Sequence, residues 1–336
     1  MSGRSSGRAS GGWLASPPPS TAIEIASRRV TGVSLSDSGR TRVITSYASE
    51  VLPPGAVDPT LNAPNVQDAG ALAAAVKAVV GRVTPRGRRV ALVLPDTVAK
   101  VSLVRFEKVP QKAQDLDQLI RWQVRKAAPF RIEDAQVSWQ AGTEPAGGGR
   151  EFVVTTARRD IVQAYERACE AAGVHAGIVD IATPNVINAV LATADIPADA
   201  DWLLVHVAAE YATLAVIRGE DLVFFRNRPA SEAGDLVDLV HQTAMYHEDR
   251  LGGGGFRGVV LAGAATYGID PFERLRRSIE DRIGTRVEPL DFRSGVSLRD
   301  RITVGPETLD ALAPAVGVLL RERAVRRAAA RGGRVA

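Results

Sequence analysis

Apolar and polar residues alternate along residues 21–35, which read TAIEIASRRVTGVSL. Apolar residues alternate with polar or small ones on both sides of a small polar corner at residues 26–29. Alternation with a period of two is typical of a β-strand, and a short corner between two such runs is typical of a hairpin. Glu24 lies two positions before the corner, so a carboxylate is expected at the mouth of this hairpin.

The same pattern returns at residues 202–229, which read as strand, small-residue corner, strand, turn at Gly219 and strand. Residues 22–35 and 204–217 share the order apolar, polar, apolar, small, small, followed by a threonine before the apolar run resumes. A hairpin duplicated in this way predicts two similar α/β domains that face each other, and clefts between such domains are common ligand sites. The length of 336 residues also favours two domains, because a single core rarely grows past about 250–300 residues.

The rest of the chain alternates between strand-like and helix-like segments. Apolar residues at helical spacing predict helices, and short apolar runs next to Gly, Pro or Arg predict strands. Helices are predicted at residues 66–81 (ending on Gly81), 113–128, 159–174, 182–192, 232–252, 272–284 and 307–327. Strands are predicted at residues 40–52, 88–95, 98–110, 152–157, 176–181 and 258–265, and after Pro129.

The helix predicted at residues 113–128 has one apolar stripe, with Trp122 at its margin. The stripe consists of Leu116, Leu119, Ile120, Val124 and Ala127.

Composition places the chain among ordinary globular proteins, with 45% hydrophobic and 24% charged residues. The sequence pI is 9.4, but the basic residues are concentrated at the two ends. The segment from Arg321 onward has a net charge of +5 and the leader +2, so the remaining residues are at −3 within the total of +4. Specific nucleic-acid binding is therefore not expected, although a basic tail can contact anionic lipid weakly. The N-terminus has no apolar stretch typical of a secretory signal and no run long enough to span a membrane, which favours a cytoplasmic location.

Several kinds of chemical site find little support. Cys169 is the lone cysteine, which excludes an internal disulfide, and it is expected to be a buried, inert thiol. His241 and His247 are six residues apart on a predicted helix and therefore on opposed faces, so they form no metal pair. Glu24 with Asp180 remains an alternative as a catalytic acid pair, without any hydrolase motif around it.

Two hairpins followed by a strand that ends in small residues, VVLAGAA, resemble the actin/Hsp70/sugar-kinase ATPase fold. Within that fold the chain resembles the PilM family of type IV pilus assembly proteins over about residues 20–322. The segments that resemble the family are LIRWQVRKAAPFRIEDAQVSWQ (119–140), VVTTARRDIVQAYERACEAAGVHAGIVDIATPNVINAV (153–190), RPASEAGDLVDLV (228–240) and LAPAVGVLLR (312–321).

The resemblance implies an α/β, actin-like fold of two duplicated domains with a small inserted α+β subdomain. The expected division is a disordered tail at 1–19, a first actin-like domain at 20–91 and 171–200, an inserted subdomain at 92–170, a second actin-like domain at 201–322 and a basic tail at 323–336. The resemblance also implies a groove for a partner's tail between the inserted subdomain and the first domain. Trp122, Pro129 and Phe130 are the candidates near this groove.

In that fold, three short segments contact the nucleotide. The matching residues here are Glu24, Ala26, Ser27, Arg28 and Thr31 in the first hairpin, His206, Ala208, Ala209 and Thr213 in the second, and Gly263 and Ala264 at the third.

All three segments depart from the family pattern. The first hairpin usually runs Asp-Ile-Gly-Ser-Ser-x-x-Lys, whereas this chain has Glu24 for the Asp, Ala26 for the Gly and Thr31 for the Lys. The Cβ of Ala26 occupies space where backbone N–H groups would approach phosphate oxygens. Thr31 removes the positive charge of the usual Lys, which Arg28 or Arg29 is able to replace.

The second hairpin usually runs Asp-Ile-Gly-Ala-x-x-x-Thr, and here His206 replaces the Asp and Glu210 adds a negative charge. Two like charges about 4 Å apart repel by roughly 4 kcal/mol at an effective dielectric constant of ~20. The usual Gly-Gly of the third segment is Gly263-Ala264. We therefore expect no cofactor, or only weak binding of ATP and Mg²⁺.

The resulting hypothesis is a non-enzymatic, actin-like scaffold at the cytoplasmic face of the inner membrane, within the type IV pilus assembly platform. Its expected partners are the N-terminal tail of a bitopic, PilN-like membrane protein, the pilus motor ATPases and further copies of itself in a ring. Two alternatives stay open. One is an active actin-like ATPase or a sugar or acetate kinase. The other is a cytoplasmic platform protein of type II secretion, a class that usually continues into a membrane span.

Overall fold

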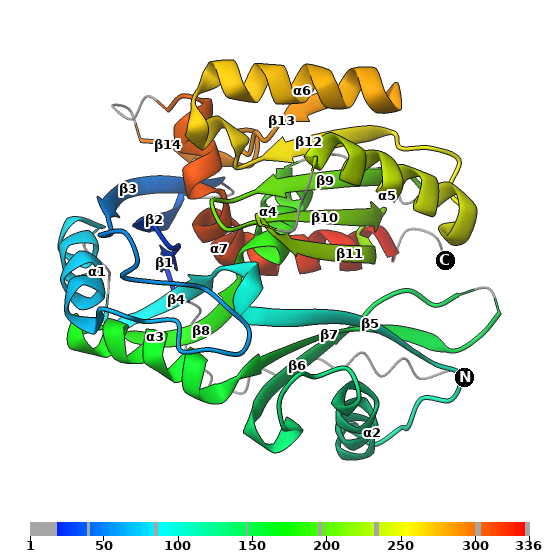
Figure 1. Ribbon diagram of the computed structural model, residues 1–336, viewed down its shortest axis with the longest axis horizontal. Coiled ribbons are helices and arrows are strands. Elements are labelled where there is room, and N and C mark those ends of the chain that lie inside the picture. Colours follow the sequence, from blue (N-terminus) through cyan, green and yellow to red (C-terminus); the bar gives the residue numbers. More distant parts are fainter. Residues whose placement is uncertain are drawn as a thin grey trace.

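The computed structural model describes residues 19–38, 41–83, 87–145, 147–193, 197, 199–231, 235–299 and 304–332, with side chains described as far as Arg321. The predicted N-terminal tail lies almost wholly outside these residues. Figure 1 shows three sheets, two of them large and sandwiched between helices, and one small sheet set apart from them.

The first large sheet has six strands in the order β14-β3-β2-β1-β4-β8. Its strands are β1 (Thr21–Ile25), β2 (Arg29–Ser38), β3 (Thr41–Val51), β4 (Arg89–Leu94), β8 (His175–Ile181) and β14 (Val296–Leu298). The predicted first hairpin is confirmed, because β1 and β2 pair antiparallel with Glu24 opposite Thr31.

The second large sheet has five strands in the order β11-β10-β9-β12-β13. Its strands are β9 (Asp201–Val207), β10 (Tyr211–Arg218), β11 (Asp221–Pro229), β12 (Gly258–Ala262) and β13 (Val287–Pro289). The arrangement of β3-β2-β1-β4-β8 recurs in this sheet, with two antiparallel pairings followed by two parallel ones. The structure thus bears out the duplication inferred from the two hairpins.

Helices cover both faces of each large sheet. They are α1 (Ala69–Val83), α3 (Arg159–Ala171), α4 (Ala182–Thr193), α5 (Leu236–Leu251), α6 (Ile269–Ile283) and α7 (Pro306–Gly332). Residues of α1 and α3 form a core with one face of the first sheet, and residues of α5 and α6 form a core with one face of the second. Between the sheets, α4 and α7 contribute to a third core that both sheets share. There Gly317 of α7 lies so close to the carbonyl of Asn185 on α4 that a Cβ would overlap it.

The small sheet, β5-β7-β6, carries one helix on one face. Its elements are β5 (Ala99–Phe106), α2 (Ala113–Arg125), β6 (Ala135–Ala141) and β7 (Arg150–Arg158). Short 3-10 turns are η1 (Asp96–Val98), η2 (Ile132–Asp134) and η3 (Ala264–Tyr267).

The strand pairing corrects several predicted boundaries. The inserted unit spans about residues 99–158, so the predicted range of 92–170 is too wide: β4 ends at Leu94 within the first sheet, and α3 packs in that sheet's core. The predicted second domain, 201–322, contributes β14 to the first sheet through pairing with β3. The short strands β13 and β14 were not predicted, since three residues are too few to show alternation. The first helix continues past Gly81, which has no left-handed conformation here.

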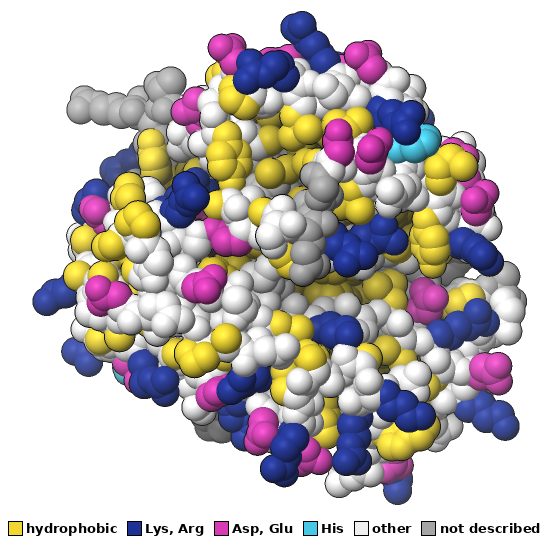
Figure 2. Space-filling model, viewed as in Figure 1, with side chains coloured by type: hydrophobic (Ala, Val, Ile, Leu, Met, Phe, Trp, Pro, Cys, Tyr) yellow, Lys and Arg dark blue, Asp and Glu magenta, His cyan; other side chains and the backbone are white. Residues whose placement is uncertain are grey.

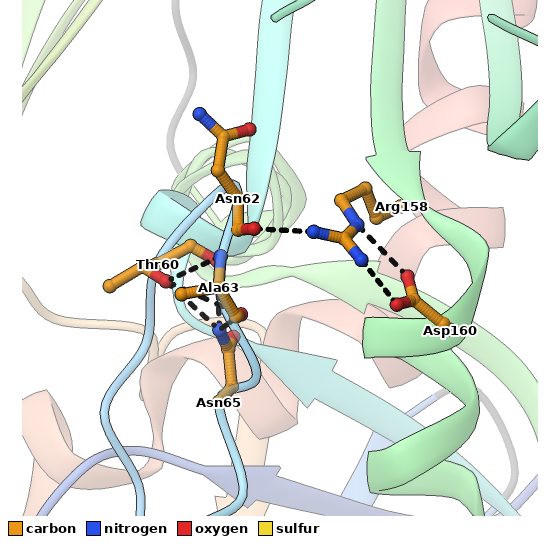
Figure 3. A network of polar contacts seen from close by, with 6 residues as sticks. All are labelled: Thr60, Asn62, Ala63, Asn65, Arg158 and Asp160. Atoms are coloured by element: carbon orange, nitrogen blue, oxygen red, sulfur yellow. Dashed lines mark hydrogen bonds and ion pairs between the residues drawn. The ribbon is translucent and has the colours of Figure 1, made fainter. Parts of the chain in front are cut away.

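A polar network fixes the loop before α1 against the inserted unit (Figure 3). Asn65 is buried, and its amide nitrogen donates to the carbonyls of Thr60 and Ala63 at 2.9 and 2.8 Å. Its side-chain oxygen accepts a hydrogen bond from the hydroxyl of Tyr165 on α3 at 3.1 Å. The loop is therefore held to α3 from within.

At the end of β7, Arg158 links the inserted unit to the same loop. Its guanidinium donates to the carbonyl of Asn62 and forms an ion pair with Asp160 at the start of α3. This contact lies at one of the two points where the chain passes between the inserted sheet and the first domain (Figure 3).

Asp96, in the turn after β4, joins the two large domains. Its carboxylate accepts hydrogen bonds from the backbone N–H of Thr183 at 2.9 Å, from the Thr183 hydroxyl, and from the Thr213 hydroxyl at 2.6 Å. Asn227 donates to Thr213 at 2.8 Å, and the Thr183 hydroxyl lies 2.7 Å from Nδ1 of His206. Since Thr183 has one hydroxyl proton and gives it to Asp96, His206 donates to Thr183 through Nδ1–H. Every hydrogen bond of this network is therefore donated in the direction of one buried carboxylate, that of Asp96.

We predict that Asp96→Ala lowers the free energy of unfolding by about 3 kcal/mol or more, because three buried donors lose their acceptor. Urea unfolding followed by circular dichroism measures this loss. Asp115→Ala, at an exposed position of α2, is the matched control and should change stability by less than about 0.5 kcal/mol. A loss below about 1 kcal/mol for Asp96→Ala would contradict the role given to this residue.

Candidate functional site

The turns of the two hairpins face each other across a cavity of about 270 Å³. Most of the residues that the sequence assigns to a nucleotide site come together here: Glu24, Ala26, Arg28, His206, Ala208, Ala209 and Gly263. The cavity is completed by residues that sequence reasoning had not assigned to it, among them Tyr211, Tyr267 and Asp310. Asp310 belongs to α7, far from both hairpins in the sequence, and no motif marks it.

Four other predicted residues do not line the cavity. Thr31 is buried and its hydroxyl lies 3.3 Å from that of Ser49, while the Thr213 hydroxyl donates to Asp96. Ala264 is buried in the core of the second domain, and Ser27 lies in the first turn without lining the cavity.

Both hairpin turns are closed by their own backbone. The N–H of Ala26 donates to the carbonyl of Arg29 at 2.9 Å, and the N–H of Ala208 donates to the carbonyl of Tyr211 at 2.9 Å. These two N–H groups are therefore already hydrogen-bonded within their own turns.

Gly263 is required by close packing of the second domain. It has a φ of 80°, and a Cβ at this position would overlap the carbonyl oxygen of Val207 at the end of β9. The left-handed conformation and the close approach both favour glycine. Close packing against β9 therefore explains why glycine is needed at position 263.

Burial raises the pKa of the carboxyl groups that line the cavity. Glu24 is 7% exposed, and burial raises its pKa to about 7, against the opposing effect of the Arg29 charge. Burial also raises the pKa of Glu210, and it raises that of Asp310 to about 6 even though Asp310 accepts the N–H of Ala265 at 2.8 Å.

His206 is neutral in this cavity at physiological pH. Burial is the main cause that lowers its pKa to about 4, and the nearby Arg29 charge acts in the same direction. The edge-on ring of Tyr211, 5.9 Å away between centroids, packs beside it. A neutral imidazole that donates through Nδ1 lacks the hard anionic oxygen that Mg²⁺ prefers as a ligand.

The fit of this cavity to a magnesium triphosphate is poor. A triphosphate needs several N–H donors, but the turn N–H groups of Ala26 and Ala208 are already bonded within their turns. Glu210 also adds a carboxyl group to the cavity lining. Within the described residues, no group of three or more His, Cys, Asp or Glu side chains is placed to hold a metal ion. Arg28 and Arg29 are the cationic side chains of the cavity lining.

A second cavity, of about 400 Å³, lies between the inserted sheet and the first domain. Residues 176–181 of β8 form one side, and Gln136 and Ser138 of β6 form the other. Residues of β7 and the start of α3, including Arg159 and Gln163, form its base. We call it the subdomain groove. Arg159 and Gln163 also line an adjacent cavity that contains Phe130.

The predicted partner-binding residues lie beyond this groove. Trp122 is 60% exposed on α2, with the Lys126 ammonium 5.7 Å from its ring centroid, and α2 covers the opposite face of the small sheet from Gln136 and Ser138. Phe130 packs partly against the α2 core and lines the adjacent cavity, and Pro129 beside it is exposed. Phe130 is therefore nearest to the groove.

The other residues that the sequence analysis considered for a chemical site do not come together in one. Asp180 lines the subdomain groove, whereas Glu24 lines the cavity between the hairpins, so the two form no acid pair. His247 is buried and binds Asp201, with 2.6 Å from Nε2 to Oδ2, in a contact that Arg218 shares. Cys169 is buried, as expected.

We predict that Glu24→Gln stabilises the protein in a pH-dependent way. The raised pKa means that folded Glu24 binds more protons than the unfolded side chain between its ordinary pKa of 4.5 and about 7, so ionisation costs stability as the pH rises through this window. The variant should match the parent below pH 4.5 and gain on the order of 2–3 kcal/mol above pH 7. Thermal and urea unfolding between pH 4 and 8 measure the gain.

The matched control is Glu248→Gln, at an exposed position of α5, which should show no such trend. A pH-independent difference for Glu24→Gln would contradict the assignment of a buried, destabilised carboxylate.

Known proteins resemble this chain in sequence and in fold. Residues 22–235, more than half of the chain, match the profile of the family described as type IV pilus assembly protein PilM. No curated protein matches the chain in sequence.

Among solved structures, one described as a PilM-PilN type IV pilus biogenesis complex matches with a TM-score of 0.71 and 20% identity over 91% of this chain and 98% of the other. The cytoplasmic domain of EpsL, an inner-membrane component of the type II secretion system of Vibrio cholerae, matches with a TM-score of 0.46 and 11% identity, covering 87% and 94% of the two chains. A protein of unknown function from Bacteroides thetaiotaomicron with an actin-like ATPase fold matches with a TM-score of 0.48 and 10% identity, covering 90% and 95%.

The duplicated sheets, the facing hairpins and the inserted unit are thus those of the actin-like ATPase fold, and the chain belongs to the PilM family of type IV pilus assembly proteins.

Proposed function

We propose that this protein is a scaffold that binds the cytoplasmic N-terminal tail of a bitopic, PilN-like membrane protein in the subdomain groove. The observation that carries the proposal is the groove itself, a cavity of about 400 Å³ bounded by the outermost strands of two different sheets. β8 is the last strand of the first sheet, and β6 is the last strand of the small sheet.

Strand edges of this kind suit an extended peptide. An added peptide strand bonds through its backbone to an unpaired edge, and pockets beside the edge select alternate side chains. The groove offers both apolar and polar contacts, because Leu94, Val98 and Val162 line it and Gln136 and Ser138 are exposed on β6. We therefore propose that the tail binds extended along β8 and continues toward Phe130.

The likeness to a PilM-PilN complex supports the choice of partner. No helix among the described residues is long and apolar enough to cross a membrane. We propose that contact with the PilN-like tail places the protein at the cytoplasmic face of the inner membrane, where it links this partner to the pilus motor ATPases and can assemble as a ring. Positive and negative side chains are interspersed over the face shown in Figure 2, an arrangement that suits protein partners better than nucleic acid.

We further propose that the protein is not an enzyme and that its nucleotide binding is weak or lost. The support is the poor match between a triphosphate and the cavity, whose lining includes the carboxyl group of Glu210 and the neutral imidazole of His206.

A substitution in the groove should weaken tail binding without unfolding the protein. Ser138→Trp places a large side chain at an exposed position of β6 that lines the groove, so we expect an affinity loss of at least ~10-fold for the tail peptide of the cognate PilN-like protein. Fluorescence anisotropy of a labelled peptide measures the affinity.

Ser297→Trp makes the same change at an exposed position of β14 and should leave binding unchanged. Equal affinity for both variants would contradict the groove assignment. Trp122→Ala and Phe130→Ala then show whether the peptide extends past the groove: we expect weaker binding for Phe130→Ala and little change for Trp122→Ala.

We predict that Mg-ATP at millimolar concentration raises the thermal unfolding midpoint by less than about 1 °C, because a ligand stabilises only in proportion to its binding. A rise of several degrees that Ala208→Phe abolishes would contradict the loss of nucleotide binding and would favour an active ATPase.

A further inference from the structure

The cavity between the hairpins holds an unusual share of unsatisfied polar atoms. In the described part of the chain, six buried side-chain nitrogen or oxygen atoms have no hydrogen-bond partner. Three of them belong to residues that line this one cavity: Oε2 of Glu24, Oε1 of Glu210 and Nε of Arg29. An unmet buried polar group costs about 1–3 kcal/mol, and more when it is charged, so three in one cavity indicate a missing partner.

The three groups come from both domains. Glu24 lies in β1 and Arg29 begins β2, whereas Glu210 lies in the turn between β9 and β10. A ligand that contacts all three bridges the first and second domains next to the Asp96 junction.

The nature of the unmet groups defines the ligand. Two are carboxylate oxygens, which need N–H or O–H donors, and one is a guanidinium nitrogen, which needs an acceptor. The carboxyl groups that line the cavity are those of Glu24, Glu210 and Asp310, the guanidinium groups are those of Arg28 and Arg29, and His206 is neutral. Burial raises the pKa of all three carboxyls, and a cation bound beside them would favour their ionised forms. The surplus of carboxylates favours a cationic group on the ligand.

The size of the cavity limits the ligand further. Its volume of about 270 Å³ is slightly below the roughly 300–1,000 Å³ of pockets for drug-sized molecules. A molecule with the bulk of one amino acid suits this volume better than a whole nucleotide does.

We propose that the cavity binds a small zwitterion, an amino-acid-like molecule whose guanidinium or ammonium group donates to Glu24 and Glu210 and whose carboxylate accepts from Arg29. The proposal is separate from tail binding in the subdomain groove, which can hold or fail independently. It rests on one element of the proposed function, namely that no triphosphate binds in this cavity.

The test uses the full chain and L-arginine as the probe, with agmatine, L-glutamate and Mg-ATP as comparison ligands. Agmatine has the guanidinium without the carboxylate, and L-glutamate carries a net negative charge. We expect L-arginine at about 10 mM to raise the unfolding midpoint by roughly 3 °C or more and agmatine to bind at least ~10-fold more weakly. L-Glutamate and Mg-ATP should produce no shift.

Variants locate the binding. Glu24→Gln and Glu210→Gln should each weaken L-arginine binding by at least ~10-fold in isothermal titration, whereas Glu248→Gln should not. Loss of binding through misfolding is recognised from the unliganded protein, because Glu24→Gln should unfold at the same or a higher temperature than the parent at pH 8. The proposal is overturned if L-arginine causes no shift, if binding survives both cavity variants, or if Mg-ATP binds more tightly than L-arginine and loses binding in the same variants.

Proton linkage distinguishes a cationic from an anionic occupant. A cation beside Glu24 favours its ionised form, so binding releases protons and affinity rises between pH 6 and 8, whereas a phosphate takes protons up. Arg29 on β2, Glu210 in the β9–β10 turn and Asp96 in η1 are the charged groups that act on Glu24. Titration in buffers of different ionisation enthalpy measures the sign, and proton uptake on L-arginine binding would overturn the proposal.

Discussion

A single buried carboxylate determines how the two halves of this protein meet. Asp96 follows β4 of the first sheet, and it accepts hydrogen bonds from α4 and from β10 of the second sheet. Burial raises its pKa, and the hydrogen bonds from Thr183 and Thr213 oppose that shift by favouring the charged form. A buried charge without such partners costs several kcal/mol, so the two sheets are tied to the arrangement that supplies all of its donors. The two hairpin turns face each other in that arrangement.

The position of Asp96 affects what the cavity can do. The resemblance to actin-like ATPases implies a nucleotide that would contact both hairpins and so help to join the domains. Here the direct network from Asn227 through Asp96 to His206 joins them within the protein. His206 takes part in this network as a neutral donor, so its role is explained by contacts inside the chain and needs no ligand. The cavity that remains is small and rich in carboxylates, and the subdomain groove is the larger recess.

Much of the fold followed from local patterns in the sequence. Alternation in residues 21–35 and 202–229 predicted both hairpins, and their likeness predicted the duplicated sheets. The limits of the inserted unit were harder to predict from the sequence. The apolar periodicity of α3 shows that one face of this helix is buried, but it does not show whether that face packs on the small sheet or, as observed, beside α1. Of the residues assigned to the nucleotide segments, most lie around the cavity between the hairpins, whereas Ser27, Thr31, Thr213 and Ala264 do not line it, and Asp96 and Asp310 were not predicted. Asp96 has a signal, a carboxylate directly after a buried strand and Pro95, whereas Asp310 is brought to the cavity by tertiary packing of α7 alone. A helical wheel placed Trp122 at the margin of the apolar stripe of α2, but it could not show that this margin faces away from the subdomain groove.

We propose the subdomain groove as the docking surface and expect no triphosphate in the cavity between the hairpins. A crystal structure of the full chain, grown with the PilN-like tail peptide and a non-hydrolysable ATP analogue with magnesium, tests both statements at once. The predicted result is peptide density along β8 between residues 176 and 181, with no nucleotide between Glu24 and His206. A fully occupied magnesium nucleotide between the two turns, or a peptide bound elsewhere with the groove vacant, would contradict the account.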